Sequence, residues 1–172
     1  MRAEMEQGRI EAVWRERAGR LRKRPVAAQA GQDFQPVMVL GIGAERYGID
    51  LSDVQEVLPP VRATPVPGAA AMFAGVINVH GEIRPVMDLR SLLSPDAVPN
   101  SDRPRVIVLC KEGRRMGLQI DSVEEIRWIG SRDLESDENS GRSRYIKAST
   151  KDLLMLIHTG ALFAELQIGV AT

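Results

Sequence analysis

Two apolar runs separated by a histidine and a glycine are the feature that most constrains how this chain folds. Residues 73–79 form the first run, residues 83–89 form the second, and His80 and Gly81 lie between them. Because glycine adopts a positive φ without steric cost, this arrangement predicts a β-hairpin with its tight turn at Gly81. Pro85 has no amide hydrogen, so the second strand is expected to lie at a sheet edge or to carry a bulge there.

Short apolar or alternating runs recur along the chain from Val37 onward. Gly, Pro and Asn interrupt these runs at distances typical of hairpins, which favours a barrel or a sandwich and therefore an all-β fold class. Further strands are expected at residues 37–42, 47–51, 106–110, 116–120, 123–129 and 153–157. Short helical turns are expected at residues 89–93 and 161–166, and the polar segment 131–144 is expected to be a surface loop.

The first 24 residues differ in composition from the rest of the chain. They hold eight Lys or Arg and four Asp or Glu, whereas the whole chain has 23 of each kind. Apolar residues recur among them at helical spacing, which predicts an amphipathic helix with one narrow apolar stripe. The stripe residues are Ile10, Val13, Trp14 and Leu21. This stripe needs a partner, and its own chain, a second copy or another protein could each supply one.

Pro25 ends the expected helix, because proline cannot continue one. Residues 25–36 are rich in Pro, Ala, Gln and Gly, and they are interpreted as a linker. The domain organisation expected from the sequence is therefore an extension at residues 1–24, a linker at residues 25–36 and one domain at residues 37–172.

Composition argues against several cellular locations and partner classes. The formal net charge is zero, so no global charge attracts nucleic acid or a membrane. The N-terminus is charged and lacks the apolar core of a secretory signal. No apolar run approaches the roughly 20 residues that a membrane-spanning helix needs, so no direct membrane insertion is expected. A cytoplasmic protein is the expectation.

The chain offers no plausible set of catalytic or metal-binding residues. Its two histidines, His80 and His158, are far apart and have no Cys or carboxylate at zinc-ligand spacing. The single cysteine, Cys110, lies inside an apolar run and is expected to be a buried, inert thiol. We therefore expect neither an enzyme nor a bound cofactor.

Four segments, in order, resemble the CheW family of bacterial chemotaxis adaptors. Residues 75–90, Gly-Val-Ile-Asn-Val-His-Gly-Glu-Ile-Arg-Pro-Val-Met-Asp-Leu-Arg, are similar to the core motif of the family. Residues 47–57 are similar to its "Tyr-x-Ile … Val-x-Glu-Val" stretch, residues 65–68 to its Pro-rich link, and residues 117–123 to its "Gly-Leu-x-Val-Asp-x-Val" stretch. The resemblance runs from about residue 34 to about residue 166.

This resemblance implies two small five-stranded barrels packed around a shared apolar core, with a helical extension before them. It also implies an adaptor that couples a methyl-accepting chemoreceptor to a CheA-type histidine kinase in membrane-associated receptor arrays. One barrel face would bind the regulatory domain of the kinase, and the groove between the barrels would receive the helical tip of the receptor. The residues expected at partner contacts are Val54, Glu56, Val57, Asn78, His80 and Gly81.

The chain departs from the family pattern at His80. In the family an arginine stands at this place and pairs with the glutamate equivalent to Glu56, near the surface that couples receptor and kinase. Without the resemblance, Glu56 is simply an exposed carboxylate at a strand edge. Two alternatives to the chemotaxis adaptor remain open. One is a diverged CheW-like scaffold for another motility or developmental pathway, and the other is a module that binds nucleic acid or a membrane surface through Arg15 to Arg24.

Overall fold

The computed structural model describes residues 34–96, 104–135 and 144–168, which belong to one compact unit, Phe34–Thr172. The predicted amphipathic helix at residues 1–24 lies outside the described residues, as does the linker up to residue 33. Strand β1 (Phe34–Ile42) begins at Phe34. The last three residues of the expected linker are therefore part of a strand.

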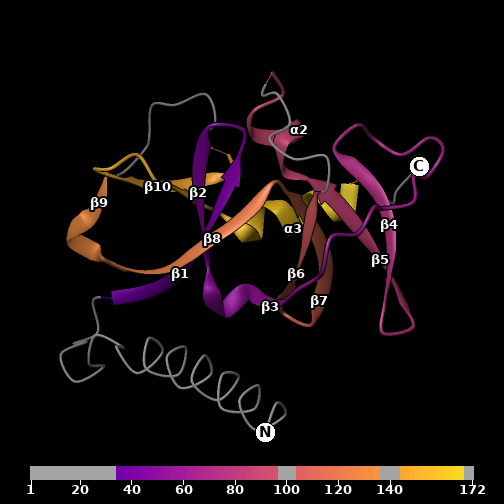
Figure 1. Ribbon diagram of the computed structural model, residues 1–172, viewed down its shortest axis with the longest axis horizontal. Helices are drawn as coiled ribbons and strands as arrows, with labels where there is room; N and C mark the ends of the chain where they lie inside the picture. The colour runs from indigo at the N-terminus through magenta and orange to yellow at the C-terminus, as the bar shows by residue number, and fades with distance from the viewer. Residues whose placement is uncertain (1–33, 97–103, 136–143, 169–172) are drawn as a thin grey trace, which may run out of the picture. The chain divides into compact units, whose positions relative to one another are not determined.

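A sheet of six strands, called the first sheet, is built from the two ends of the described chain (Figure 1). Adjacent strands are antiparallel except β2 and β11, which pair in parallel. Within the first sheet, β1 has a neighbouring strand on each side, whereas β8 and β9 are the end strands. In order across the sheet, the strands are β8 (Ser122–Gly130), β1, β2 (Glu45–Asp50), β11 (Met155–Ile157), β10 (Ile146–Thr150) and β9 (Leu134–Glu135).

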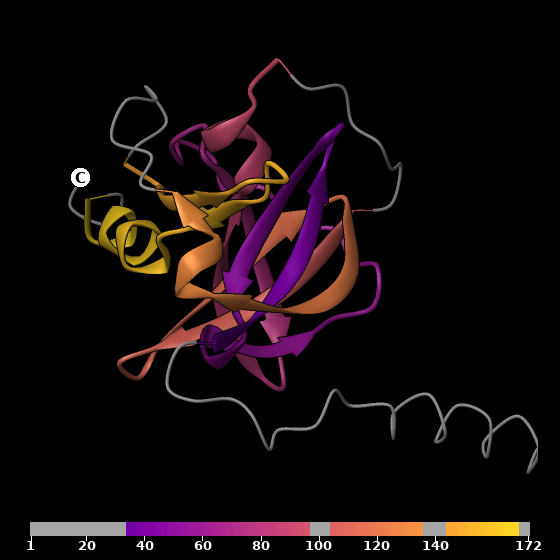
Figure 2. The same cartoon turned by 90° about the vertical axis from the view of Figure 1, so that its left-hand side faces the viewer.

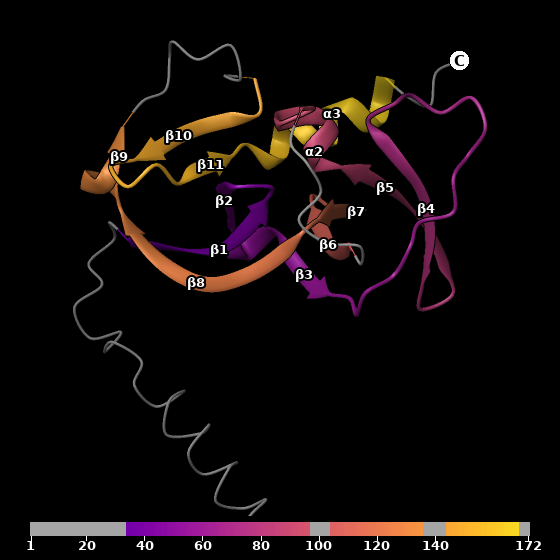
Figure 3. The same ribbon diagram turned by 45° about the horizontal axis from the view of Figure 1, so that its top comes forward.

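A sheet of five strands, called the second sheet, is built from the middle of the chain. Figure 3 shows it beside the first sheet, with the two short α-helices close to their junction. Its strands, in order, are β3 (Val54–Val57), β6 (Arg105–Lys111), β7 (Arg114–Ile120), β5 (Glu82–Asp88) and β4 (Phe73–Val79). The short helices are η1 (Leu51–Asp53), α2 (Leu89–Leu93), η2 (Ser131–Asp133) and α3 (Thr159–Ile168).

Both sheets contribute to one apolar cluster, called the shared core. The cluster is closed by α2 and α3, and its burial supplies the main free energy that holds the sheets together. Each sheet also has a smaller core of its own, around Val39 in the first sheet and around Val106 in the second. The shared core comprises Met38, Leu40, Ile42, Tyr47, Ile49, Met87, Leu89, Leu93, Ile107, Leu109, Met116, Leu118, Ile120, Ile146, Ile157, Leu162 and Phe163.

Two buried carboxylates add polar contacts between the sheets. Asp53 of η1 accepts hydrogen bonds from Lys111 of β6 and from the hydroxyl of Thr159 at the start of α3. Asp121, between β7 and β8, accepts one from the backbone amide of Gly43 at 2.7 Å and one from the guanidinium of Arg90. These contacts satisfy charges that would otherwise be costly to bury.

The all-β fold with two strand units around a shared core is confirmed. The first sheet has one strand more than expected, because the two-residue strand β9 pairs with the edge of β10. Residues 131–135 form η2 and β9, so the prediction of a loop was wrong for this part of segment 131–144. The two expected helical turns are α2 and α3.

The hairpin of residues 73–89 is β4 and β5, and β5 lies between β4 and β7. The prediction of an edge strand or of a bulge at Pro85 was therefore wrong, because the register shift of this hairpin lies between Phe73 and Gly75. Pairing of β5 with β7 begins only at Val86. Pro85 pairs with Val76 of β4 and lies just before that second ladder. The missing amide hydrogen of Pro85 therefore costs the sheet no hydrogen bond, which explains why an internal strand tolerates proline.

Candidate partner-binding surface

The turn of the β4–β5 hairpin consists of two residues with positive φ. His80 has φ 52° and Gly81 has φ 88°, as a type I′ turn requires. The side-chain oxygen of Asn78 accepts a hydrogen bond from the backbone amide of Gly81 at 2.8 Å, which fixes the turn locally. The predicted corner at His80-Gly81 is confirmed, and the histidine also takes the left-handed conformation.

A close backbone contact fixes the other end of the hairpin. Gly75 has φ 135°, and a Cβ atom added there would lie 2.1 Å from the carbonyl oxygen of Thr64. Thr64 and Val76 exchange two backbone hydrogen bonds, of 2.8 and 2.9 Å. The first glycine of the motif therefore lets the preceding segment lie against β4, because no other residue fits in this space.

The hairpin turn brings His80 to Glu56 of strand β3. The Nε2 atom of His80 lies 3.1 Å from Oε2 of Glu56, and the two side chains are 77% and 28% exposed. The structure thus brings together the two residues that the sequence resemblance matches to the arginine and the glutamate of the family motif. Such an exposed contact contributes little to folding, so both side chains are available to a partner.

A bulge in β3 separates the remaining predicted residues into two faces. Val54 pairs with Leu109 and Glu56 with the next residue, Val108, so the register shifts between them. Paired residues point to the same side of a sheet, and alternate residues point to opposite sides. Val54 therefore faces the shared core with Leu109, whereas Glu56 shares the face of Val108, which belongs to the second sheet's own core.

Val57 pairs with Ile107, a member of the shared core, and so lies on the same face as Val54. Its side chain is nevertheless 39% exposed. The predicted partner residues thus form two surfaces rather than one. Val54 and Val57 line the face toward the first sheet, whereas Glu56, Asn78, His80 and Gly81 lie around the hairpin turn.

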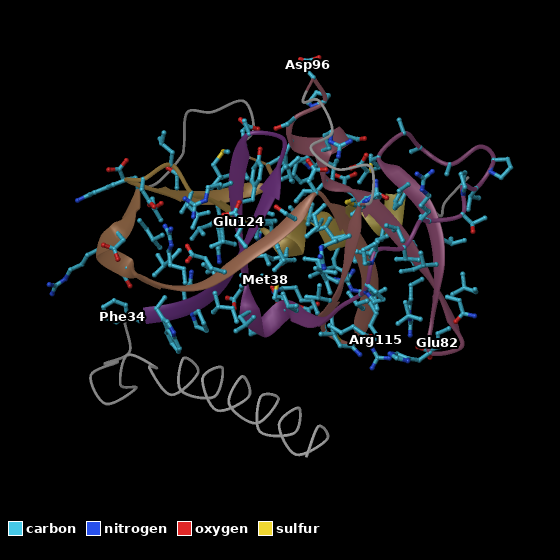
Figure 4. The ribbon with its side chains drawn as sticks, in the orientation of Figure 1. Phe34, Met38, Glu82, Asp96, Arg115 and Glu124 are labelled. Carbon is cyan, nitrogen blue, oxygen red and sulfur yellow. The ribbon has the colours of Figure 1, made fainter. Side chains whose placement is uncertain are left out.

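Charged side chains surround the hairpin turn. Arg115 of β7 lies 3.5 Å from Glu82 of β5, and Arg84 also pairs with Glu82. Figure 4 shows Glu82 and Arg115 at the same end of the second sheet. Ile83, next to the turn, is 63% exposed. An exposed apolar side chain within a charged rim is typical of a surface that contacts a protein partner.

The described part of the chain shows no arrangement for metal chemistry or membrane crossing. No group of three or more His, Cys, Asp or Glu side chains lies close enough to hold a metal ion in this part. No helix among the described residues is long and apolar enough to cross a membrane. Cys110 is partly buried on β6 rather than fully enclosed.

Sequence reasoning missed a second exposed apolar surface, on β8. Ile126 is 55% exposed and Trp128 is 48% exposed, although residues 123–129 were predicted only as a strand and not as a surface. Both residues alternate with the charged Glu125 and Arg127. That alternation signals a strand with two different faces, but it cannot tell which face is covered.

The CheW-like domain family matches residues 36–167, which include nearly all of both sheets and the whole β4–β5 hairpin. The chain belongs to the CheW-like family. Its members act as adaptors or scaffolds in chemotaxis signal transduction, and so does this chain.

Named relatives and a solved structure show the same similarity. The chemotaxis protein CheW of Rhizobium meliloti is 27% identical over 128 residues, which cover 71% of this chain and 83% of the relative. The probable chemotaxis protein CheW of Rhizobium etli is 27% identical over 140 residues, covering 78% and 90%. The solved scaffolding protein TtCheW from Thermoanaerobacter tengcongensis superposes with a TM-score of 0.65 at 27% identity, covering 72% of this chain and 88% of that one.

Proposed function

We propose that this chain is a non-catalytic adaptor that couples a chemoreceptor to a CheA-type histidine kinase. The observation that carries the proposal is the Glu56–His80 contact, which joins β3 to the hairpin of the family motif at 3.1 Å. In the family this pair lies near the surface that couples receptor and kinase. The chain would work in the cytoplasm and be recruited to membrane-associated receptor arrays.

The two surfaces described above suggest a division of labour. The apolar face with Val54 and Val57 suits the helical tip of a methyl-accepting receptor, because a helix can bury one apolar stripe against it. The hairpin end of the second sheet, with Ile83 inside its charged rim, suits the regulatory domain of the kinase. The adaptor changes kinase output only if it binds the active and inactive arrays with different affinity.

Titration of the chain with the regulatory domain of the cognate kinase and with a receptor-tip fragment tests the proposal. Calorimetry should show micromolar binding of the kinase domain, about −8 kcal/mol, because array avidity supplements each single contact. The full chain and residues 34–172 should bind alike if residues 1–24 are a separable extension. Absence of kinase binding to both forms would remove the main support for an adaptor of this kind.

A pair of matched variants localises the receptor contact. Val57→Asp should weaken binding of the receptor fragment and leave kinase binding unchanged, since a charge there cannot be buried without cost. Leu153→Asp is the control, because Leu153 is 79% exposed and lies on the turn between β10 and β11. Equal receptor affinity for both variants would exclude Val57 from the contact.

The alternative of a nucleic-acid-binding or membrane-surface-binding module predicts a different dependence of affinity on salt. A module that binds nucleic acid or anionic lipid through Arg15 to Arg24 should show an affinity that falls steeply with salt concentration. Titration of the full chain with DNA and with anionic vesicles at two salt concentrations separates this alternative from the adaptor. Residues 34–172 alone should then lose the binding.

A further inference from the structure

The turn of the β4–β5 hairpin has little packing to hold it. The side chains of Asn78, His80 and Ile83 are exposed. A Cβ atom added at Gly81 would meet no atom within 4 Å. In Figure 1 the hairpin lies on the side of the second sheet that is turned away from the first sheet, and Figure 2 shows the first sheet in front of it. The conformation of the turn is therefore set by local contacts rather than by burial.

The residue types at the two turn positions do not specify the turn by themselves. A two-residue type I′ turn needs positive φ at both positions, and its preferred pairs are Asn-Gly, Asp-Gly and Gly-Gly. Gly81, with φ 88°, accepts this conformation without steric cost, but the first position is His80, with φ 52°. A residue with a Cβ atom is disfavoured there, so the turn needs a further contact to keep its conformation.

Asn78 supplies that contact. Its side-chain oxygen accepts a hydrogen bond from the backbone amide of Gly81 at 2.8 Å. Asn78 also pairs with Ile83 across the hairpin, so the two side chains lie on the same face of the sheet. From the same turn, His80 reaches Glu56 at 3.1 Å. One acceptor therefore fixes the turn beside both exposed side chains, His80 and Ile83.

We propose that Asn78 is a positioning residue, which holds the turn in the conformation that presents His80 and Ile83 to a partner. This role rests on the proposed function, because the hairpin end is the surface assigned there to the kinase domain. If the partner binds only the native turn, its apparent affinity is reduced by the fraction of chains in which that turn is formed. Asn78 raises the affinity by keeping this fraction high, without touching the partner.

A direct contact between Asn78 and the partner is the competing explanation, and it uses a different atom. The amide nitrogen of Asn78 has no hydrogen-bond partner among the described residues, so a direct contact would use this donor. The turn uses only the oxygen. Aspartate keeps an acceptor at the same place and lacks the donor, and it forms the same kind of turn contact. Glutamine keeps the donor, but its longer side chain moves the oxygen away from Gly81.

Titration with the regulatory domain of the cognate kinase separates the two roles. The full-length variants Asn78→Ala and Asn78→Gln should bind about tenfold more weakly, as expected if the turn is formed in about one chain in ten. Asn78→Asp should bind within about twofold of the unsubstituted chain, and measurement at two salt concentrations screens its added charge. Thermal unfolding should be nearly the same in all four proteins, because the turn is exposed.

Hydrogen exchange of the Gly81 amide, followed by NMR of the full chain, reports on the turn without any partner. This amide donates to the side chain of Asn78. Its protection should therefore be lost in Asn78→Ala and in Asn78→Gln, and kept in Asn78→Asp. A purely structural role would change this exchange but would leave the affinity for the kinase domain unaltered.

The two measurements together decide the role of Asn78. If Asn78→Asp loses affinity and Asn78→Gln keeps it, the residue contacts the partner directly. If protection of the Gly81 amide survives Asn78→Ala, the turn does not depend on this side chain. Equal affinity in all four proteins would show that the turn does not limit binding. Failure of the unsubstituted chain to bind the kinase domain would instead overturn the proposed function, whereas the amide exchange alone decides whether Asn78 holds the turn.

Discussion

Asp53 and Glu56 lie three positions apart in the sequence but have opposite environments. The carboxylate of Asp53 is buried between the sheets, where Lys111 donates to both of its oxygens, at 3.0 and 3.1 Å, and Thr159 donates as well. Among the described residues, Glu56 has one hydrogen-bonding partner, the side chain of His80, which is 77% exposed. The bulge in β3, between the two residues, turns the chain from the junction of the sheets to the rim of the hairpin.

This difference separates buried contacts, which stabilise the fold, from exposed contacts, whose side chains can bind a partner. Removing one member of a buried, multiply bonded pair leaves polar groups without partners, which costs several kcal/mol. An exposed pair loses little, since water replaces the missing partner. Substitutions between the two sheets, as at Asp53, should therefore change stability. Substitutions beside the hairpin turn, as at Glu56, should change binding to a partner.

The largest effect is expected in the shared core. Leu118 is fully buried there, and Leu118→Ala should lower the free energy of unfolding by about 3 kcal/mol through lost burial and a cavity. Chemical denaturation measures this change. Leu153→Ala, at a side chain that is 79% exposed, should cost less than about 0.5 kcal/mol. Similar losses in the two variants would mean that the two sheets are not held by the shared core.

A smaller loss is expected from the buried carboxylate. Asp53→Ala leaves Lys111 and Thr159 without their acceptor and should cost about 2 kcal/mol. Lys111 is one-third exposed, so water compensates part of the loss. The matched change Glu56→Ala should cost less than about 1 kcal/mol. If Glu56→Ala proves as destabilising as Asp53→Ala, then the exposed Glu56–His80 contact stabilises the fold as much as the buried contacts of Asp53 do, and the proposed difference is wrong.

At the rim, His80→Arg should change partner choice rather than stability. Arginine can make bidentate contacts with a carboxylate, whereas the shorter histidine side chain cannot. We expect tighter binding of a conventional receptor-tip fragment and a change in unfolding free energy below about 1 kcal/mol. Parallel titrations of both forms with the receptor fragment and the kinase domain provide the measurement. Unchanged affinity for every partner would place residue 80 outside the working interface.

The smallest effect concerns an exposed carboxylate near β8. Hydrogen bonds from Thr150 and then Arg127 hold the pKa of Asp152 below its ordinary value of 3.8. A lowered pKa in the folded state adds stability above the ordinary pKa, and this stability is lost as the pH falls through the folded value. Asp152→Asn should therefore reduce stability at pH 6 by less than about 1 kcal/mol, and this loss should shrink as the pH falls through 3.8 and further. Denaturation across this pH range measures the change, and a loss that does not depend on pH would show that ionisation of Asp152 is not its cause.

Local patterns were sufficient to predict most strands and the hairpin. The two apolar runs around Gly81 specify a tight turn, because glycine accepts positive φ without steric cost. The positive φ of His80 was not predicted from the sequence. β10 was missed, since its apolar residues Ile146 and Ala148 alternate with polar ones over only five residues. Ser131–Glu135 was interpreted as loop, because nothing local indicates that β9 pairs with β10.

The candidate surface was predicted only in part, for a similar reason. Glu56 and His80 were matched through the family motif, and the structure brings them into contact. Their separation from Val54 and Val57 depends on a single extra residue in β3. A bulge reverses the faces of all residues beyond it, and no residue type in this segment signals it.

The sequence by itself determined the all-β class and the hairpin with its tight turn at Gly81, because these depend on alternation and on φ preferences that act within a few residues. Only the tertiary structure decided that Asp53 is buried while Glu56 is not, and that Ile126 and Trp128 are about half exposed. Burial depends on which distant strands become neighbours. Pairing of β2 with β11 joins segments more than a hundred residues apart, and no local pattern encodes such a contact.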